Sequence, residues 1–121
     1  MVLVDTSIWV THFRDKHLQL EDLLIKGQAV CHPYVIGELA CGNLKNRNKI
    51  LSLLHELPMA TQASHKEVLH FIEEHKLMGL GLGYIDIHLL ASVFLSGVSL
   101  WTKDRRLKDA ADQLHISFRD K

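Results

Sequence analysis

The sequence has no excess of charge of either sign, since fourteen Lys and Arg balance fourteen Asp and Glu over 121 residues. Net charge therefore points to no partner, and a nucleic-acid binder of this composition would depend on local basic patches. Cysteine is scarce: Cys31 and Cys41 have no motif spacing. We therefore expect neither a disulfide framework nor a thiolate metal site, but reduced thiols in a cytoplasmic protein.

Long hydrophobic runs are also lacking. Asp5 interrupts any apolar region at the start, so no signal peptide is predicted. The most apolar stretch, residues 85–101, is broken by polar residues and a glycine and is too short to span a bilayer. With no repeats and no composition boundary, we expect residues 1–121 to form a single cytoplasmic domain without a membrane partner.

The first strand is the clearest element. Residues 2–4 are apolar at every position, which is typical of a central parallel strand buried on both faces. Asp5 follows directly, and Thr6 and Ser7 offer hydroxyls that we expect to cap the next helix. Ligands gather outside the carboxyl ends of strands in open α/β sheets, so Asp5 stands where chemistry usually occurs. A simple helix cap is an equally good interpretation of this acid alone.

Helical patterns alternate with short strands along the rest of the chain. The further strands are expected at residues 29–31, 57–60, 98–102 and 116–118. Ser64 and Glu67 have the spacing of a capping box, and the glycine-rich segment 79–83 is read as a loop. This alternation predicts an α/β fold, a three-layer α/β/α domain with a central parallel sheet.

Three further acids are candidates to meet Asp5 at one edge of the sheet. Glu38 lies in an apolar helical run, Asp86 in the first turn of the most apolar helix, and Asp104 after the strand at 98–102. Each has a structural alternative, because Glu38 could be an exposed helix residue and the other two could be local caps.

Four carboxylates in one crevice repel each other unless cations lie between them. Since no thiolate or convincing histidine set accompanies them, they suit Mg²⁺ or Mn²⁺, ions that activate water for phosphodiester cleavage. The histidines at 65, 70 and 75 recur every five residues, which spreads them around a helix. We expect His88 to be a satisfied, half-buried side chain, and no serine or cysteine nucleophile is indicated.

Four segments resemble the PIN domain, and more narrowly the VapC-type toxins of bacterial toxin–antitoxin pairs. They stand in the family's order and span nearly the whole chain: residues 2–9 (VLVDTSIW), 35–39 (VIGEL), 83–91 (GYIDIHLLA) and 100–105 (LWTKDR). The resemblance implies a PIN-like domain acting as a magnesium- or manganese-dependent endoribonuclease on RNA. It also implies a homodimer and a cognate antitoxin, a segment of which occupies the active-site groove.

The resemblance also assigns site residues. The family's acidic quartet is matched by Asp5, Glu38, Asp86 and Asp104, and its hydroxyl positions by Thr6 or Ser7 and by Thr102. Lys103, Arg105 and Arg106 flank a predicted metal ligand, where an RNA backbone would lie. The pair Arg105-Arg106 departs from relatives, which often carry an arginine followed by histidine.

Two other classes of protein are alternatives to a PIN-domain ribonuclease. A catalytically inactive PIN-like module that binds RNA or protein is the main alternative, although a binding surface gains nothing from four mutually repelling acids. A dehalogenase-type phosphatase needs a second aspartate where Ser7 stands, and a receiver domain needs an early acidic pair, of which only Asp5 is present.

Overall fold

The computed structural model describes residues 1–120. Lys121, the last residue of the predicted domain, lies outside the described residues. Within 1–120 the chain forms three strands and seven helices. Their order is β1 (Val2–Val4), α1 (Thr6–Arg14), α2 (Leu18–Ile25), β2 (Ala29–Val30), α3 (Pro33–Ala40), α4 (Arg47–His55), α5 (His65–His75), α6 (Tyr84–Ser96), β3 (Ser99–Trp101) and α7 (Arg105–Gln113).

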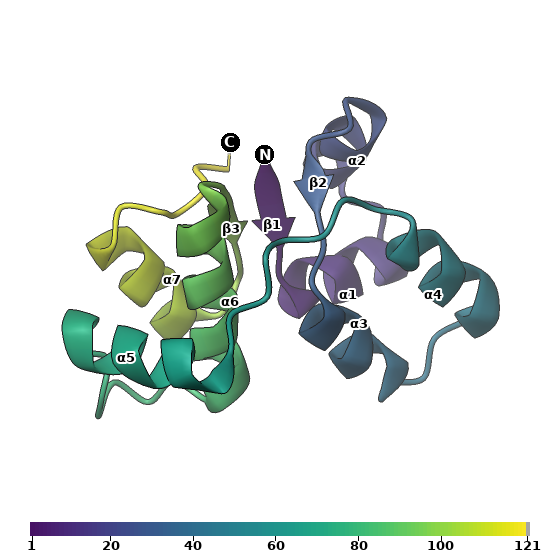
Figure 1. Ribbon diagram of the computed structural model, residues 1–121. Helices are drawn as coiled ribbons and strands as arrows, with labels where there is room; N and C mark the ends of the chain where they lie inside the picture. The colour runs from purple at the N-terminus through teal and green to yellow at the C-terminus, as the bar shows by residue number, and fades with distance from the viewer. Residues whose placement is uncertain (121) are drawn as a thin grey trace.

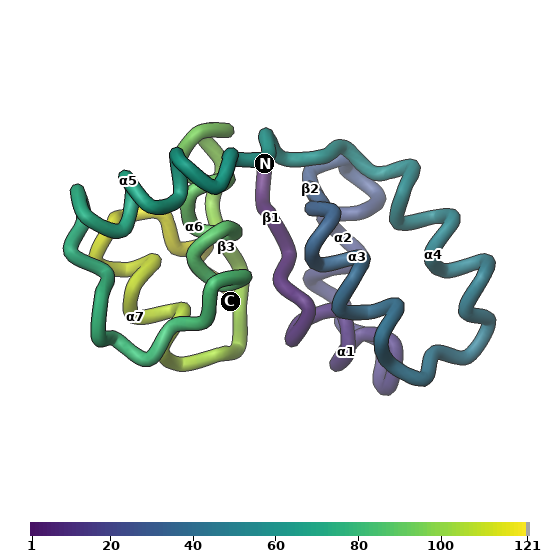
Figure 2. Tube along the Cα trace, turned by 60° about the horizontal axis from the view of Figure 1, so that its bottom comes forward, coloured from purple at the N-terminus to yellow at the C-terminus, as the bar shows by residue number. Residues whose placement is uncertain are grey.

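The strands form one parallel sheet in the order β2-β1-β3. Figures 1 and 2 show β1 in the middle of the molecule. On one side of it lie β3, α5, α6 and α7, and on the other side lie β2 and helices α1 to α4. All three residues of β1 are buried although successive side chains point to opposite faces, so helices cover both faces of the sheet. The predicted three-layer α/β/α fold is confirmed.

Two of the predicted strands are reduced to single bridges at the sheet edges. Met59 pairs with Cys31 beside β2, and Ser117 pairs with Leu100 beside β3. The first contact consists of hydrogen bonds from the Cys31 N–H to the Pro58 carbonyl, 2.8 Å, and from the Ala60 N–H to the Cys31 carbonyl, 2.9 Å. Pro58 has no N–H to donate, which limits how far this edge can pair.

The helix most enclosed by the rest of the molecule is α6. Its residues 87–93 are buried without interruption, as the apolar sequence predicts. The capping box expected at the start of α5 is present, with Ser64 and Glu67 each accepting the other's backbone N–H. Among the described residues, no helix is both long and apolar enough to cross a membrane.

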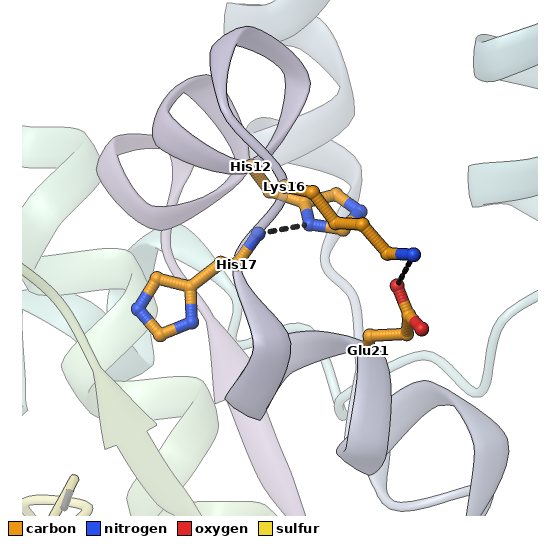
Figure 3. Close-up of polar contacts among 4 residues, drawn as sticks. All are labelled: His12, Lys16, His17 and Glu21. Atoms are coloured by element: carbon orange, nitrogen blue, oxygen red, sulfur yellow. Dashed lines mark hydrogen bonds and ion pairs between the residues drawn. The ribbon is translucent and has the colours of Figure 1, made fainter.

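Polar contacts close the corner between α1 and α2 (Figure 3). The backbone N–H of His17 donates to Nδ1 of His12 over 3.1 Å, and Lys16 pairs with Glu21 at 2.9 Å. The His17 ring packs edge-on against Trp101, the last residue of β3, with centroids 5.0 Å apart. This corner therefore supports the end of the strand that leads into Thr102.

Candidate active site

Asp5 lies at the carboxyl edge of the sheet, directly after β1, with only 6% of its surface exposed. Its Oδ2 accepts hydrogen bonds from the hydroxyls of Thr102, 2.7 Å, and Ser7, 2.9 Å. Asp5 holds the N-cap position of α1, but its side chain makes no capping bond. The carboxylate is therefore aimed at the strand ends, and the helix-cap interpretation of this acid does not describe it.

The hydroxyls of Thr6 and Ser7 do not cap α1 either, so that prediction is wrong. Ser7 turns back to Asp5, and Thr6 donates to Oε1 of Glu38 over 2.7 Å. Both residues lie inside α1, whose N-cap position is held by Asp5, so their hydroxyls are not placed to cap it and donate to nearby carboxylates. Both hydroxyls thus donate to the acids and neither caps the helix.

Backbone donors after β3 orient the hydroxyls that hold Asp5. The N–H of Asp104 donates to Oγ1 of Thr102 and the N–H of Lys103 donates to Oγ of Ser7, each over 3.0 Å. Because each hydroxyl oxygen already accepts a backbone proton, its own proton points to the carboxylate. Nothing in the sequence singles out these two N–H groups, since any non-proline residue provides one.

Glu38 is presented to solvent by α3. The helix buries Val35, Ile36 and Leu39 against the core and leaves Glu38 exposed on the opposite side. Glu38 is therefore exposed, as its structural alternative expects, but its carboxylate also accepts the Thr6 hydroxyl proton at the start of α1. Because α1 begins immediately after Asp5, this bond ties the second acid to the segment that carries the first.

Asp86 lies in the first turn of α6, where its Oδ2 accepts the backbone N–H of Gly83 over 3.0 Å. Burial is the largest cause that raises the pKa of Asp86 above its ordinary value, and the charges of Asp104 and Asp5 raise it further. The Gly83 hydrogen bond opposes these effects. Asp86 therefore lies within electrostatic reach of both Asp104 and Asp5.

Asp104 is both a helix cap and a member of this group. Its Oδ1 accepts the backbone N–H of Leu107 over 3.0 Å, which caps α7. The side chain remains exposed at the carboxyl end of β3, next to Thr102. Capping thus accounts for one of its two oxygens.

The four carboxylates share one feature. Each uses a single oxygen to accept hydrogen bonds from the protein, and the second oxygen accepts none from residues 1–120. They do not form a closed ligand set, because nowhere in that range do three His, Cys, Asp or Glu side chains lie together as ligands of one ion. The free oxygens are hard donors of the kind Mg²⁺ and Mn²⁺ prefer, and the acids' repulsion would fall with a cation between them.

A groove extends from the Thr6–Glu38 pair along α1 and α4. Its walls include apolar Val10, Phe13 and Ile50, with Arg14 and Lys45 at its polar positions. The ammonium of Lys103 donates to the hydroxyl of Thr11, in α1, over 3.1 Å. Arg105 and Arg106 are exposed, and neither guanidinium has a hydrogen bond or ion pair with a described residue.

Two histidines, His32 and His88, are buried. His32 accepts the N–H of Tyr34 at Nδ1 and contacts the Ser92 hydroxyl through Nε2, 3.0 Å. His88 is 2% exposed, and its Nδ1 has no partner among the described residues. The expectation of a satisfied His88 is therefore wrong: its ring packs against Tyr34 and Tyr84, which meet it edge to face.

Comparison with known proteins gives a consistent set of likenesses. A family model described as PIN domain matches residues 2–113. The chain is 44% identical over 119 residues to "Ribonuclease VapC32" of Mycobacterium tuberculosis, in strains CDC 1551 and H37Rv alike, covering 98% of this chain and 96% of that protein. The crystal structure of PAE2754 from Pyrobaculum aerophilum has the same fold at 18% identity, with a TM-score of 0.61 over 93% of this chain and 85% of that one.

Proposed function

The chain belongs to the PIN-domain family, of the VapC type, and on that premise we propose that it is a divalent-metal-dependent endoribonuclease, the toxin of a toxin–antitoxin pair. The relative named a ribonuclease aligns over nearly the full length of both chains, which supports RNA as the substrate. The observation that carries the proposal is the unused oxygen on each of Asp5, Glu38, Asp86 and Asp104. We further propose that residues 1–121 act as a single domain.

The acids have distinct roles in this proposal. Asp5 and Asp104, at the carboxyl ends of neighbouring strands, would hold the Mg²⁺ or Mn²⁺ ion directly, and Glu38 and Asp86 would hold it directly or through water. When bound, such an ion activates water and stabilises the leaving oxygen of a phosphodiester. Ser7 and Thr102 fix the orientation of the Asp5 carboxylate, so that its free oxygen keeps one position.

Cations beside the acids would bind the RNA backbone. Three cations are exposed here: Lys103 directly follows Thr102, and Arg105 and Arg106 directly follow Asp104. Phosphate contacts position a nucleic acid without reading its sequence, so these residues would place the scissile bond and leave target choice to other contacts.

The groove beside Glu38 is the proposed seat of the antitoxin. Its apolar walls suit an amphipathic segment, and Arg14 and Lys45 suit carboxylates on that segment. A segment there would cover Thr6 and Glu38 and so block the site. We also propose a cytoplasmic homodimer, as the VapC resemblance implies.

The test is cleavage of a panel of labelled RNAs, each with Mg²⁺, Mn²⁺ or chelator. The control is Asp86→Asn, whose amide oxygen can still accept the Gly83 N–H and so preserves the start of α6. Metal-dependent cutting that the variant lacks is the expected result. RNA binding without cutting and without a metal-induced rise in Tm would instead establish the inactive binding module.

A further inference from the structure

The guanidinium of Arg106 lies on the backbone of Gly81, in the glycine-rich loop before α6. A Cβ atom added at Gly81 would stand 2.5 Å from Nη1, 3.0 Å from Cζ and 3.1 Å from Cδ of Arg106. These distances are shorter than van der Waals contact, so the Arg106 side chain occupies the space that any side chain at Gly81 would need. A side chain at Gly81 would therefore displace the Arg106 guanidinium from where it lies.

This contact joins the two segments that carry Asp86 and Asp104. Gly81 stands two positions before Gly83, whose N–H holds Asp86, and Arg106 stands two positions after Asp104. Arg106 therefore packs against the loop that holds Asp86, at the edge of the acid group.

The donors of Arg106 remain available. Its guanidinium makes no hydrogen bond or ion pair within residues 1–120. Lys103, in contrast, is already engaged with Thr11. The N–H donors of a guanidinium without such bonds stay open, and they match two phosphate oxygens in a bidentate pair.

We propose that Gly81 is a positioning residue for Arg106, and that Arg106 so placed binds an RNA phosphate beside the four acids. This inference rests on the proposed ribonuclease function and goes beyond it by selecting Arg106 and naming what holds it. Restricting a long side chain before binding removes an entropy cost that an unrestrained arginine would incur.

The loop provides its own matched control. Gly81 has a φ of +77° and Gly79 a φ of +73°, so alanine at either position adopts the same disfavoured backbone conformation. A Cβ at Gly79 meets nothing within 4 Å, whereas one at Gly81 displaces Arg106. The Gly81→Ala and Gly79→Ala variants therefore share the backbone strain and differ in the guanidinium.

The experiment measures cleavage of a labelled random-sequence single-stranded RNA pool in Mn²⁺, with KM and kcat separated. We expect Gly81→Ala and Arg106→Ala each to raise KM roughly tenfold, the scale of one charge-assisted hydrogen bond. Gly79→Ala should lower Tm as much as Gly81→Ala and leave KM unchanged. The double variant Gly81→Ala/Arg106→Ala should be no worse than Arg106→Ala alone, because both changes remove one contact.

A second readout is the salt dependence of RNA binding by the chelated protein. Loss of one phosphate contact should reduce the slope of log K against log salt by about 0.7 in both Gly81→Ala and Arg106→Ala. Equal KM values for Gly81→Ala and Gly79→Ala, in a wild-type protein that cuts RNA, would overturn this inference alone. A wild-type protein that neither binds nor cuts the pool would overturn the proposed function and this inference with it.

Discussion

Thr102 donates its hydroxyl proton to Oδ2 of Asp5 over 2.7 Å, joining the end of β3 to the end of β1 across 97 positions of sequence. Both side chains are more than nine-tenths buried. Thr102→Val keeps the shape and removes the donor, so the buried carboxylate loses one of its two partners. We expect the free energy of unfolding to fall by about 1–3 kcal/mol.

The same variant should lower RNA cleavage, because Asp5 then keeps only Ser7 to orient it. Thr102→Ser is the matched control, since it retains the hydroxyl that Asp104 and Asp5 share. Urea unfolding and initial cleavage rates measure both effects. A Thr102→Val protein as stable and active as Thr102→Ser would contradict the role given to this bond.

Asp86→Asn should stabilise the metal-free protein at neutral pH and abolish most activity. Burial, with the charges of Asp104 and Asp5, raises the pKa of Asp86 in the folded state above its ordinary 3.8. The folded protein therefore holds the proton more tightly, and stability falls as pH rises from 3.8 through the raised pKa. The asparagine amide does not titrate, so the Asp86→Asn protein should not lose stability in this pH range.

The measurement is Tm against pH in chelator, followed by the same series in Mg²⁺. Added metal should raise the Tm of the wild type and not that of Asp86→Asn. We expect cleavage to fall by roughly a hundredfold or more, since a metal supplies several kcal/mol to the transition state. A variant destabilised in chelator and equally shifted by metal would mean that Asp86 is only a local cap.

Asp104→Asn should separate the two roles of Asp104. Asparagine is as good an N-cap as aspartate, so the bond from the Leu107 N–H survives and the stability of α7 changes little. The charge is lost, and with it a proposed ligand, so cleavage should fall. Asp104→Ala should lose activity and, in addition, about 1 kcal/mol of stability.

A helix cap that makes no hydrogen bond to any of the four acids gives the complementary control. Ser64→Ala removes the side chain that accepts the Glu67 N–H at the start of α5. We expect it to lower the free energy of unfolding by about 1 kcal/mol and leave cleavage unchanged. Activity that tracked stability across Asp104→Asn, Asp104→Ala and Ser64→Ala would show that Asp104 acts only through folding.

His32 should make the protein less stable in mild acid. Burial, with the nearby His88, lowers the pKa of His32 from 6.5 to about 4. Because the unfolded chain takes up the proton at higher pH than the folded one, stability should decline as pH falls from about 6.5 towards 4. His32→Asn keeps an acceptor for the Tyr34 N–H, so it should flatten the decline while retaining the cap of α3. An unchanged slope would exclude His32 as its source.

Much of this fold follows from local pattern. The apolar run at 2–4 predicts β1, the Ser64–Glu67 spacing predicts the start of α5, and the uninterrupted apolar sequence of α6 predicts its central place. The edge strands were predicted too long, because their pairing depends on which backbone donors face a neighbour and not on β-propensity.

The sequence predicts less of the candidate site than of the fold. The acids are visible in the sequence, and the family resemblance assigns Thr6 or Ser7 and Thr102 to the same site, but local pattern predicts Thr6 and Ser7 as helix caps. Only the folded chain shows that Thr6 faces Glu38 and that Thr102 faces Asp5. The isolated Nδ1 of His88 and the contact between Gly81 and Arg106 depend in the same way on long-range packing, which no spacing rule encodes.

The four free carboxylate oxygens are proposed to bind a divalent ion jointly, and titration calorimetry of Mn²⁺ into the protein measures this binding. The wild type should bind one or two ions, and Asp5→Asn, Glu38→Gln, Asp86→Asn and Asp104→Asn should each weaken binding while remaining folded. Equal Mn²⁺ affinity in the wild type and all four variants, or no binding by the folded wild type, would show that the four acids do not form a metal site.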